Sequence, residues 1–164
     1  MKNFKKLLVI ALAGLVVTFA EVGRALDLYN CNELSLDIIG FTASRDKGGG
    51  DHQAWGPGAG VNYFFNEYLG LGADTYADAF TVPYLLNGSA VLRYPINRTP
   101  VAAYGFGGFG REWWHAPQWM EYIGAGGEYR FRPHTGAIVD IRGVFPHQTD
   151  DYWVLRFGFR ITFK

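Results

Sequence analysis

Polar residues near the C-terminus include the types that hydrolytic catalysis needs. His147, Thr149 and Asp150 offer a base, a nucleophile and an orienting acid, and His115 with Glu112 offers a second acid–base pair. His147 and Thr149 follow the turn-forming residue Pro146, in a stretch where a histidine is commonly solvated. We therefore predict no catalytic residues, and the chain is expected not to be an enzyme.

Candidate metal ligands are not grouped in the sequence. His52, His115, His134 and His147 lie in separate turn segments, and Cys31 is the single cysteine. The sequence therefore predicts no metal site and no cofactor. A single cysteine also leaves no internal disulfide, so other contacts must stabilise the fold.

Charged residues show a clearer pattern, because they fall on one face of alternating segments. Asp140 and Arg142 share parity within one segment, as do Glu128 and Arg130 within another. Charges withdrawn from water are tolerated when they are paired and hydrogen-bonded. We predict that ten such residues form one network in the lumen of a barrel. They are Asp37, Asp74, Arg93, Arg111, Glu128, Arg130, Asp140, Arg142, Arg156 and Arg160.

The segments that carry these charges alternate in the way of β-strands. Residues 152–163 alternate without interruption over about the length that a membrane-spanning strand needs. Seven further segments alternate similarly: 34–45, 55–65, 68–77, 85–94, 101–111, 122–131 and 135–145. The 22 glycines and 17% aromatic residues also suit strands and turns better than helices. We predict an all-β fold, an eight-stranded antiparallel up-and-down transmembrane β-barrel.

The first residues have the pattern of an export signal. Lys2, Lys5 and Lys6 precede an apolar run that ends in small residues. The predicted division is a cleaved signal peptide at 1–20, or alternatively 1–25, a short periplasmic segment at 26–33 and a barrel domain at 34–164. Loss of three lysines from a neutral chain leaves a net charge of −3, which indicates no nucleic-acid partner.

The polar faces of the strands indicate which way the barrel faces. A soluble barrel normally carries many Lys and Glu on its exterior, yet the lysines after residue 20 are Lys47 and Lys164. Gly and Arg instead suit the lumen of an eight-stranded barrel, which is just wide enough for side chains to fill. Four aromatic residues of the same parity add to the filling: Phe41, Phe64, Tyr76 and Phe109. The lumen is therefore predicted to be closed.

Aromatic residues gather near the expected strand ends. In a barrel that spans a bilayer, such residues form belts at the two interfaces with water. The predicted belts contain Trp55, Tyr63, Phe65, Tyr94, Trp113, Trp114, Trp119, Tyr129, Phe131 and Trp153. Membrane lipids are therefore expected partners of the outer face.

Four segments together carry a resemblance to a known family. They are VAAYGFGGFG at 101–110, GAGGEYRF at 124–131, VDIRGVF at 139–145 and DDYWVLRFGFRITF at 150–163. In this order they resemble the outer-membrane β-barrel family, the small porin-like barrels of the OmpA and OmpX type. The resemblance implies a place in the outer membrane of a Gram-negative-type bacterium, among its lipids, and recognition by the barrel-assembly machinery. The implied assembly signal is Phe159, Ile161 and Phe163, although Lys164 follows as a departure.

The resemblance implies a structural role or a surface interaction through loops outside the cell. The segments 46–54 and 112–120 are the candidate loops, and the Trp-rich second one is a candidate contact for an unknown ligand. Two alternatives stay open. One is an enzyme that modifies lipid A or phospholipid, and the other is a narrow ion pore whose excess of Arg would give a weak preference for anions.

Overall fold

The computed structural model describes residues 28–47, 50–77, 83–97, 99–113 and 117–164. The predicted signal peptide lies outside the described residues, as do Trp114 and His115. In the part of the chain that is described, no helix is long and apolar enough to cross a membrane.

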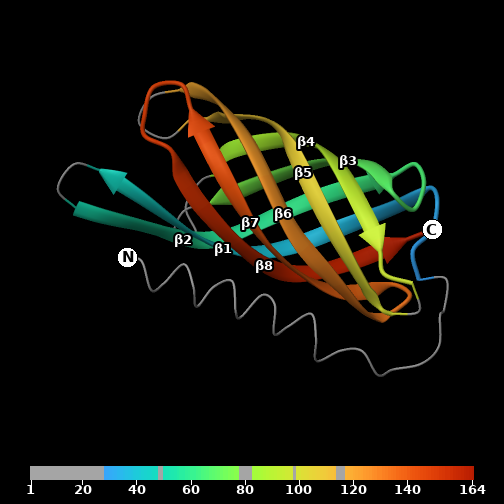
Figure 1. Cartoon of the computed structure of the whole chain (residues 1–164). Helices are drawn as coiled ribbons and strands as arrows, with labels where there is room; N and C mark the ends of the chain where they lie inside the picture. Colours follow the sequence, from blue (N-terminus) through green and yellow to red (C-terminus); the bar gives the residue numbers. More distant parts are fainter. Residues whose placement is uncertain (1–27, 48–49, 78–82, 98, 114–116) are drawn as a thin grey trace.

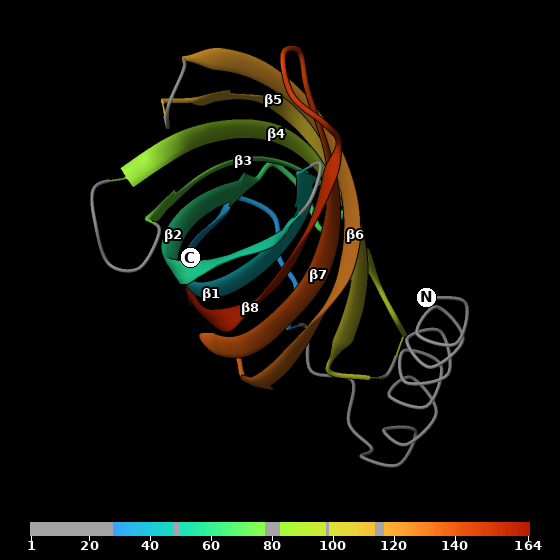
Figure 2. The same ribbon diagram turned by 90° about the vertical axis from the view of Figure 1, so that its left-hand side faces the viewer.

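Eight strands close into a single barrel. They are β1 (Glu33–Lys47), β2 (Gly50–Phe64), β3 (Leu69–Ala77), β4 (Pro83–Pro95), β5 (Val101–Glu112), β6 (Gln118–Arg132), β7 (Thr135–Pro146) and β8 (Tyr152–Phe163). Each strand pairs antiparallel with the next, and β8 pairs with β1 to close the ring (Figure 2). Closure leaves the barrel wall without an open edge strand. The predicted all-β, eight-stranded antiparallel architecture is thus confirmed.

Some strands are longer than their alternation predicted. β2 begins at Gly50 rather than at residue 55, and β6 begins at Gln118 rather than at residue 122. The pairing of Lys47 with Gly50 carries β1 and β2 beyond the rim as a two-stranded hairpin (Figure 1). The candidate loop at 46–54 was predicted too long, because the glycines at 48–50 are a turn signal in sequence, whereas β2 already begins at Gly50.

The two ends of the barrel differ in what they hold. We call the end where β1 begins and β8 ends the near end, and the opposite end the far end. β1 begins and β8 ends at the near end, because an even number of antiparallel strands returns the chain to the end from which it started (Figure 1). Short connections of residues 65–68 and 133–134 also lie there.

Alternation separates the two faces of the wall. In β8 the residues Tyr152, Val154 and Arg156 are buried, whereas Trp153 and Leu155 point outward and are exposed. The inward face is crowded, so glycine is needed where strands face large side chains. A Cβ at Gly126 would overlap the Asp140 Cβ and the carbonyl oxygen of Val139. Glycine on this face therefore makes room for the charged side chains beside it.

Candidate functional site

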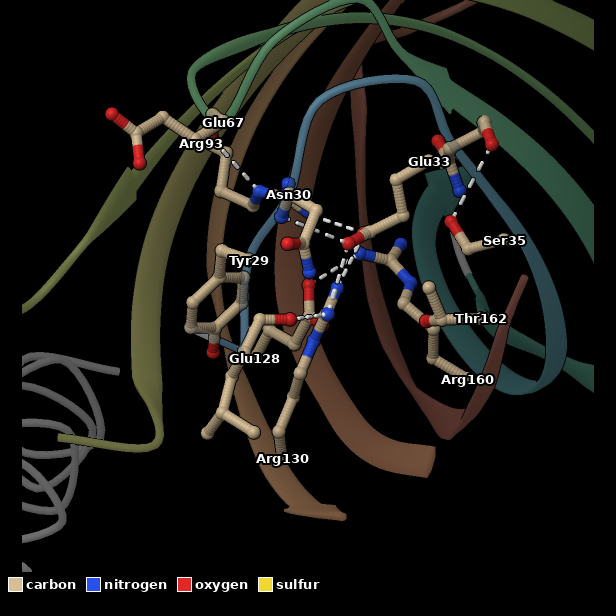
Figure 3. A network of polar contacts seen from close by, with 12 residues as sticks. Tyr29, Asn30, Glu33, Ser35, Glu67, Arg93, Glu128, Arg130, Arg160 and Thr162 are labelled. Carbon is tan, nitrogen blue, oxygen red and sulfur yellow. Dashed lines mark hydrogen bonds and ion pairs between the residues drawn. The ribbon is translucent and has the colours of Figure 1, made fainter. Parts of the chain in front are cut away.

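The lumen near the near end holds a cluster of buried ion pairs. Glu33 accepts from two arginines, with its Oε1 lying 2.6 Å from Arg93 Nη1 and 2.5 Å from Arg130 Nη2. Arg130 Nε also lies 2.6 Å from Glu128 Oε1. Figure 3 shows these groups converging from β1, β4 and β6. Since burial makes an unpaired charge costly, the matched partners are what make this cluster tolerable.

A second group of contacts joins the first strand to the last. Arg160 on β8 makes a two-pronged contact with Asp37 on β1, with both N···O distances 2.7 Å. The remaining terminal nitrogen, Nη1, lies 2.6 Å from Glu128 Oε2, and Asn62 donates to Asp37 Oδ2 at 2.8 Å. Arg160 therefore links the β1–β8 pairing to the near-end cluster. Two-pronged contacts of this kind fix geometry as well as charge.

The middle of the lumen holds a separate network of buried ion pairs, centred on Asp74 and Arg156. Asp74 on β3 lies 2.7 Å from Arg142 Nη2 and 3.1 Å from Arg156 Nη1. Arg156 also forms a two-pronged contact with Asp140, with Nε 2.5 Å from Oδ1 and Nη2 2.9 Å from Oδ2. The Tyr104 hydroxyl donates to Asp140 Oδ2 at 2.7 Å. Residues from β3, β5, β7 and β8 are thus tied together across the lumen.

Apolar side chains fill the lumen toward the far end. Phe41 packs against Tyr76 with ring centroids 5.0 Å apart, and Phe106 packs against Tyr122 at 6.3 Å. Met120, which is 1% exposed, belongs to the same core. Between the ionic networks lies a small cavity, with about 20 Å³ in which the centre of a water molecule can move. This space suits about one water molecule.

The segment before β1 covers the near end of the lumen. We call residues 28–32 the plug. The Tyr29 ring lies against the guanidinium groups of Arg93, at 5.0 Å, and Arg130, at 4.3 Å (Figure 3). Its hydroxyl donates to the Pro100 carbonyl at 2.9 Å. Arg130 also donates to the Leu28 carbonyl. Asn32, with φ of 54°, adopts the left-handed conformation that turns the chain from the plug into β1.

The Tyr29 hydroxyl stays protonated in this setting. Burial, together with the negative charge of Glu128, raises the pKa of Tyr29 well above its ordinary value. The hydroxyl therefore continues to donate to Pro100 throughout the neutral pH range. The plug thus adds a hydrogen bond and two cation–π contacts to the ionic cluster.

Replacement of the plug tyrosine is expected to weaken the barrel without abolishing it. The Tyr29→Ala variant should lose about 1–2 kcal/mol of unfolding free energy, because the cation–π contacts and the hydrogen bond disappear. Urea titration in lipid vesicles would measure the loss. Tyr68→Ala is the matched control, since Tyr68 is exposed near the same end, and it should change stability by less than about 0.5 kcal/mol. Equal losses in both variants would contradict the role given to the plug.

Nine of the ten charges assigned to the lumen lie buried inside it: Asp37, Asp74, Arg93, Glu128, Arg130, Asp140, Arg142, Arg156 and Arg160. The tenth assignment, Arg111, is wrong, because its side chain is exposed on the outer face. Phe109 likewise points outward and is 66% exposed. The other aromatic residues predicted to fill the lumen, Phe41, Phe64 and Tyr76, are buried.

The register predicted for β5 was therefore reversed. Its buried face carries Ala102, Tyr104, Phe106 and Glu112 instead. Arg111 is accommodated outside because its guanidinium lies 5.9 Å from the Trp113 ring and 5.4 Å from the Trp119 ring. A long cationic side chain at the end of a strand can lie among aromatic rings rather than enter the lumen.

Sequence reasoning also missed Glu33, a central acceptor of the near-end cluster. Glu33 was placed in a segment before the barrel, yet it is the first residue of β1 and is fully buried. Its parity with Ser35 and Asp37, both of them inward, was the signal that could have found it. Glu112 is also buried, and it accepts from Gln118 Nε2 at 3.2 Å rather than standing in a loop.

The predicted belt residues lie at the two ends of the outer face. Trp55, Trp113, Trp119 and Trp153 are exposed toward the far end, and Tyr63, Phe65, Tyr94 and Phe131 are exposed toward the near end. Tyr129 is half-buried and packs against Phe131 with centroids 5.4 Å apart. The residues of the proposed assembly signal, Phe159, Ile161 and Phe163, point outward on β8.

The candidate catalytic residues do not converge in the structure. His147 is exposed, and its Nε2 lies 4.0 Å from Glu121 Oε1. Thr149 Oγ1 instead accepts from Gln118 Nε2 at 3.3 Å, on the side of buried Glu112. Neither of these two contacts joins His147 to Thr149. Within the described residues, no group of His, Cys, Asp and Glu has the arrangement of a metal site.

Comparison with known proteins decides the fold. No protein-family model and no curated protein matches the sequence. Among solved structures, the N-terminal β-barrel domain of Pseudomonas aeruginosa OprF has 17% identity and a TM-score of 0.60, over 82% of this chain and 99% of that chain. The outer membrane protein OprG from Pseudomonas aeruginosa has 11% identity and a TM-score of 0.59, over 82% and 97%. This chain has the outer-membrane β-barrel fold.

A designed protein has a similar outer-membrane β-barrel fold. A structure described as de novo design of transmembrane β-barrels matches with 14% identity and a TM-score of 0.62, covering 87% of this chain and 100% of that chain. The resemblance in sequence to small outer-membrane barrels is therefore confirmed at the level of fold. Identities this low carry no ligand or activity from one protein to another.

Proposed function

We propose that this protein is an integral outer-membrane barrel with a structural or surface-interaction role and a closed lumen. The outer face supports the membrane location. Between the aromatic residues of the two ends, it presents exposed apolar residues such as Leu36, Ile38, Leu92 and Phe159. A soluble barrel would leave this surface in water, whereas a bilayer matches it. The outer-membrane and transmembrane descriptions of the matched structures agree with this proposal.

The near end would face the periplasm. Chains exported through a signal peptide enter the periplasm first, and both ends of the barrel chain lie at the near end. The far end, with its tryptophans and the β1–β2 hairpin, would then face outside. Outer-membrane lipids would contact the outer face, and the outward Phe159, Ile161 and Phe163 of β8 would be available to the barrel-assembly machinery.

The closed lumen argues against the pore. Arg93, Arg142 and Arg156 each pair with carboxylates inside the wall, so these three arginines do not form a row of free cations along which anions could pass. The plug and the far-end aromatic core occupy the two ends of the interior. The contacts of His147 with Glu121 and of Gln118 with Thr149 are not the hydrogen bond between base and nucleophile that the enzyme alternative needs.

Three measurements test the proposed function. After expression with its leader, the protein should be found in the outer-membrane fraction, and it should migrate differently on a detergent gel before and after boiling. A folded barrel resists detergent until heated, because closure leaves no open edge from which unfolding can begin. Recovery in the soluble periplasmic fraction would overturn the proposal. Planar-bilayer recordings should show no steady unitary conductance, and a reproducible conductance would instead establish the pore.

A further inference from the structure

We propose that Arg111, with Trp113 and Trp119, forms a docking site for a phosphate group of lipid A. The inference rests on the proposed membrane location and orientation, under which the far end faces the outer leaflet. It concerns a site on the outer face of the wall, apart from the charged lumen.

The geometry of Arg111 sets it apart from the arginines of the lumen. Its guanidinium carbon lies 5.9 Å from the Trp113 ring and 5.4 Å from the Trp119 ring, so the group is held beside two indoles at the far end of β5. Each lumen arginine meets a carboxylate, as Arg160 meets Asp37. In the described part of the chain, Arg111 has no carboxylate within ion-pair distance, and its side chain is exposed. Its charge is therefore available to a ligand.

The surroundings favour an anion in the headgroup layer. Exposed tryptophan rings are placed where apolar and polar regions of a bilayer meet, and Trp113 and Trp119 are about half exposed. Glu121, two residues beyond Trp119 on the same face, is the register partner of Phe109 rather than of Arg111, and its Oε1 lies 4.0 Å from His147 Nε2. The guanidinium fork can then bind two phosphate oxygens at once.

The exposed apolar residues beside Arg111 would bind the acyl chains of the same lipid. Leu86 on β4 pairs with Arg111 in register, and it is exposed on the same outer face. Phe109, the next outward residue of β5 toward the near end, is also exposed. A ligand that carries both a phosphate and acyl chains would place its phosphate at Arg111 and its chains along these residues. Lipid A has this combination and occupies the outer leaflet.

The test measures lipid adducts on folded protein in detergent micelles by native mass spectrometry. Wild type should bind lipid A, and Arg111→Gln should bind it about tenfold more weakly, because the charge-assisted hydrogen bonds are lost. Arg111→Lys should lie between the two, since it keeps the charge but not the fork. Arg132→Gln is the matched control, because Arg132 is an exposed arginine at the near end of β6, and it should bind as wild type does.

Dephosphorylated lipid A and diacylglycerol, neither of which carries a phosphate, separate phosphate recognition from general lipid contact. Both should bind wild type and Arg111→Gln equally and more weakly than lipid A binds wild type. Equal binding of lipid A to wild type and Arg111→Gln would overturn the inference, as would equal binding of lipid A and its dephosphorylated form to wild type. The boiling-dependent gel shift is measured on the same samples. A wild type without the shift would contradict the proposed function, whereas a wild type with the shift but no effect of Arg111→Gln would contradict this site alone.

Discussion

Asp140→Leu is expected to lower the free energy of unfolding by about 3–5 kcal/mol, the range for breaking one side of a buried ion pair. The substitution removes two contacts from Arg156 and one from the Tyr104 hydroxyl. Arg156 would keep only the 3.1 Å contact with Asp74 among its carboxylate partners. Urea titration in lipid vesicles, followed by tryptophan fluorescence, measures the change in unfolding free energy.

The double variant Asp140→Leu with Arg156→Leu distinguishes an unpaired charge from simple loss of packing. Replacing both members of a buried pair by apolar residues is often neutral, so the double variant should recover at least half of the loss. Asp150→Leu, at an exposed position in the connection between β7 and β8, is the matched control and should change stability by less than about 0.5 kcal/mol. A double variant less stable than Asp140→Leu alone would show that the pair is not the source of the loss.

Ile38→Arg is expected to cost about 2–4 kcal/mol in lipid vesicles, the range for an arginine on the lipid face of a barrel near the middle of a bilayer. Ile38 points outward and is 64% exposed. Along β1 it lies midway between Leu34, which pairs with Tyr63, and Thr42, which pairs with Trp55. These neighbours belong to the near-end and far-end aromatic residues, so Ile38 would sit deepest in the bilayer.

Leu34→Arg provides the control on the same strand and the same face. Leu34 lies beside Phe163 and Tyr63 at the near end, where an arginine should cost only about 0–1 kcal/mol. The ratio between the two variants therefore reports depth in the membrane. If both substitutions were harmless, the outer face would not be in contact with lipid, and the assignment of inside and outside would be wrong.

Strand alternation predicted the fold well, because the pattern was strong where one face carries charges. In β7 and β8, Asp140, Arg142 and Arg156 lie inside as their parity indicated. β5 shows where this reasoning fails. Both of its faces contain glycine and aromatic residues, so placing the more apolar, uncharged face outward put Arg111 inside. An arginine at a strand end can instead lie outside among tryptophans.

The plug could not be derived from alternation. Leu28 contacts Arg130 on β6, although the two are 102 positions apart in the sequence. Tyr29 contacts Arg93, which lies on a different strand, β4. Such contacts depend on the closed ring, which places β1, β4 and β6 around one opening (Figure 3). Glu33 was missed for a simpler reason, since the predicted strand began one residue too late.

The contact between Arg160 and Asp37 has a consequence for the order in which the barrel is completed. These residues lie opposite each other in the pairing of β1 with β8, and they are 123 positions apart in the chain. Pairing over such a distance must overcome a large loss of chain entropy before the stabilising contacts between the two strands can form, so folding is expected to be slow. β8 follows the other seven strands in the barrel sequence, and it supplies both the strand that β1 needs as a neighbour and the arginine that Asp37 needs as a partner. Closure of the ring and formation of this ion pair are therefore expected to occur in the same step.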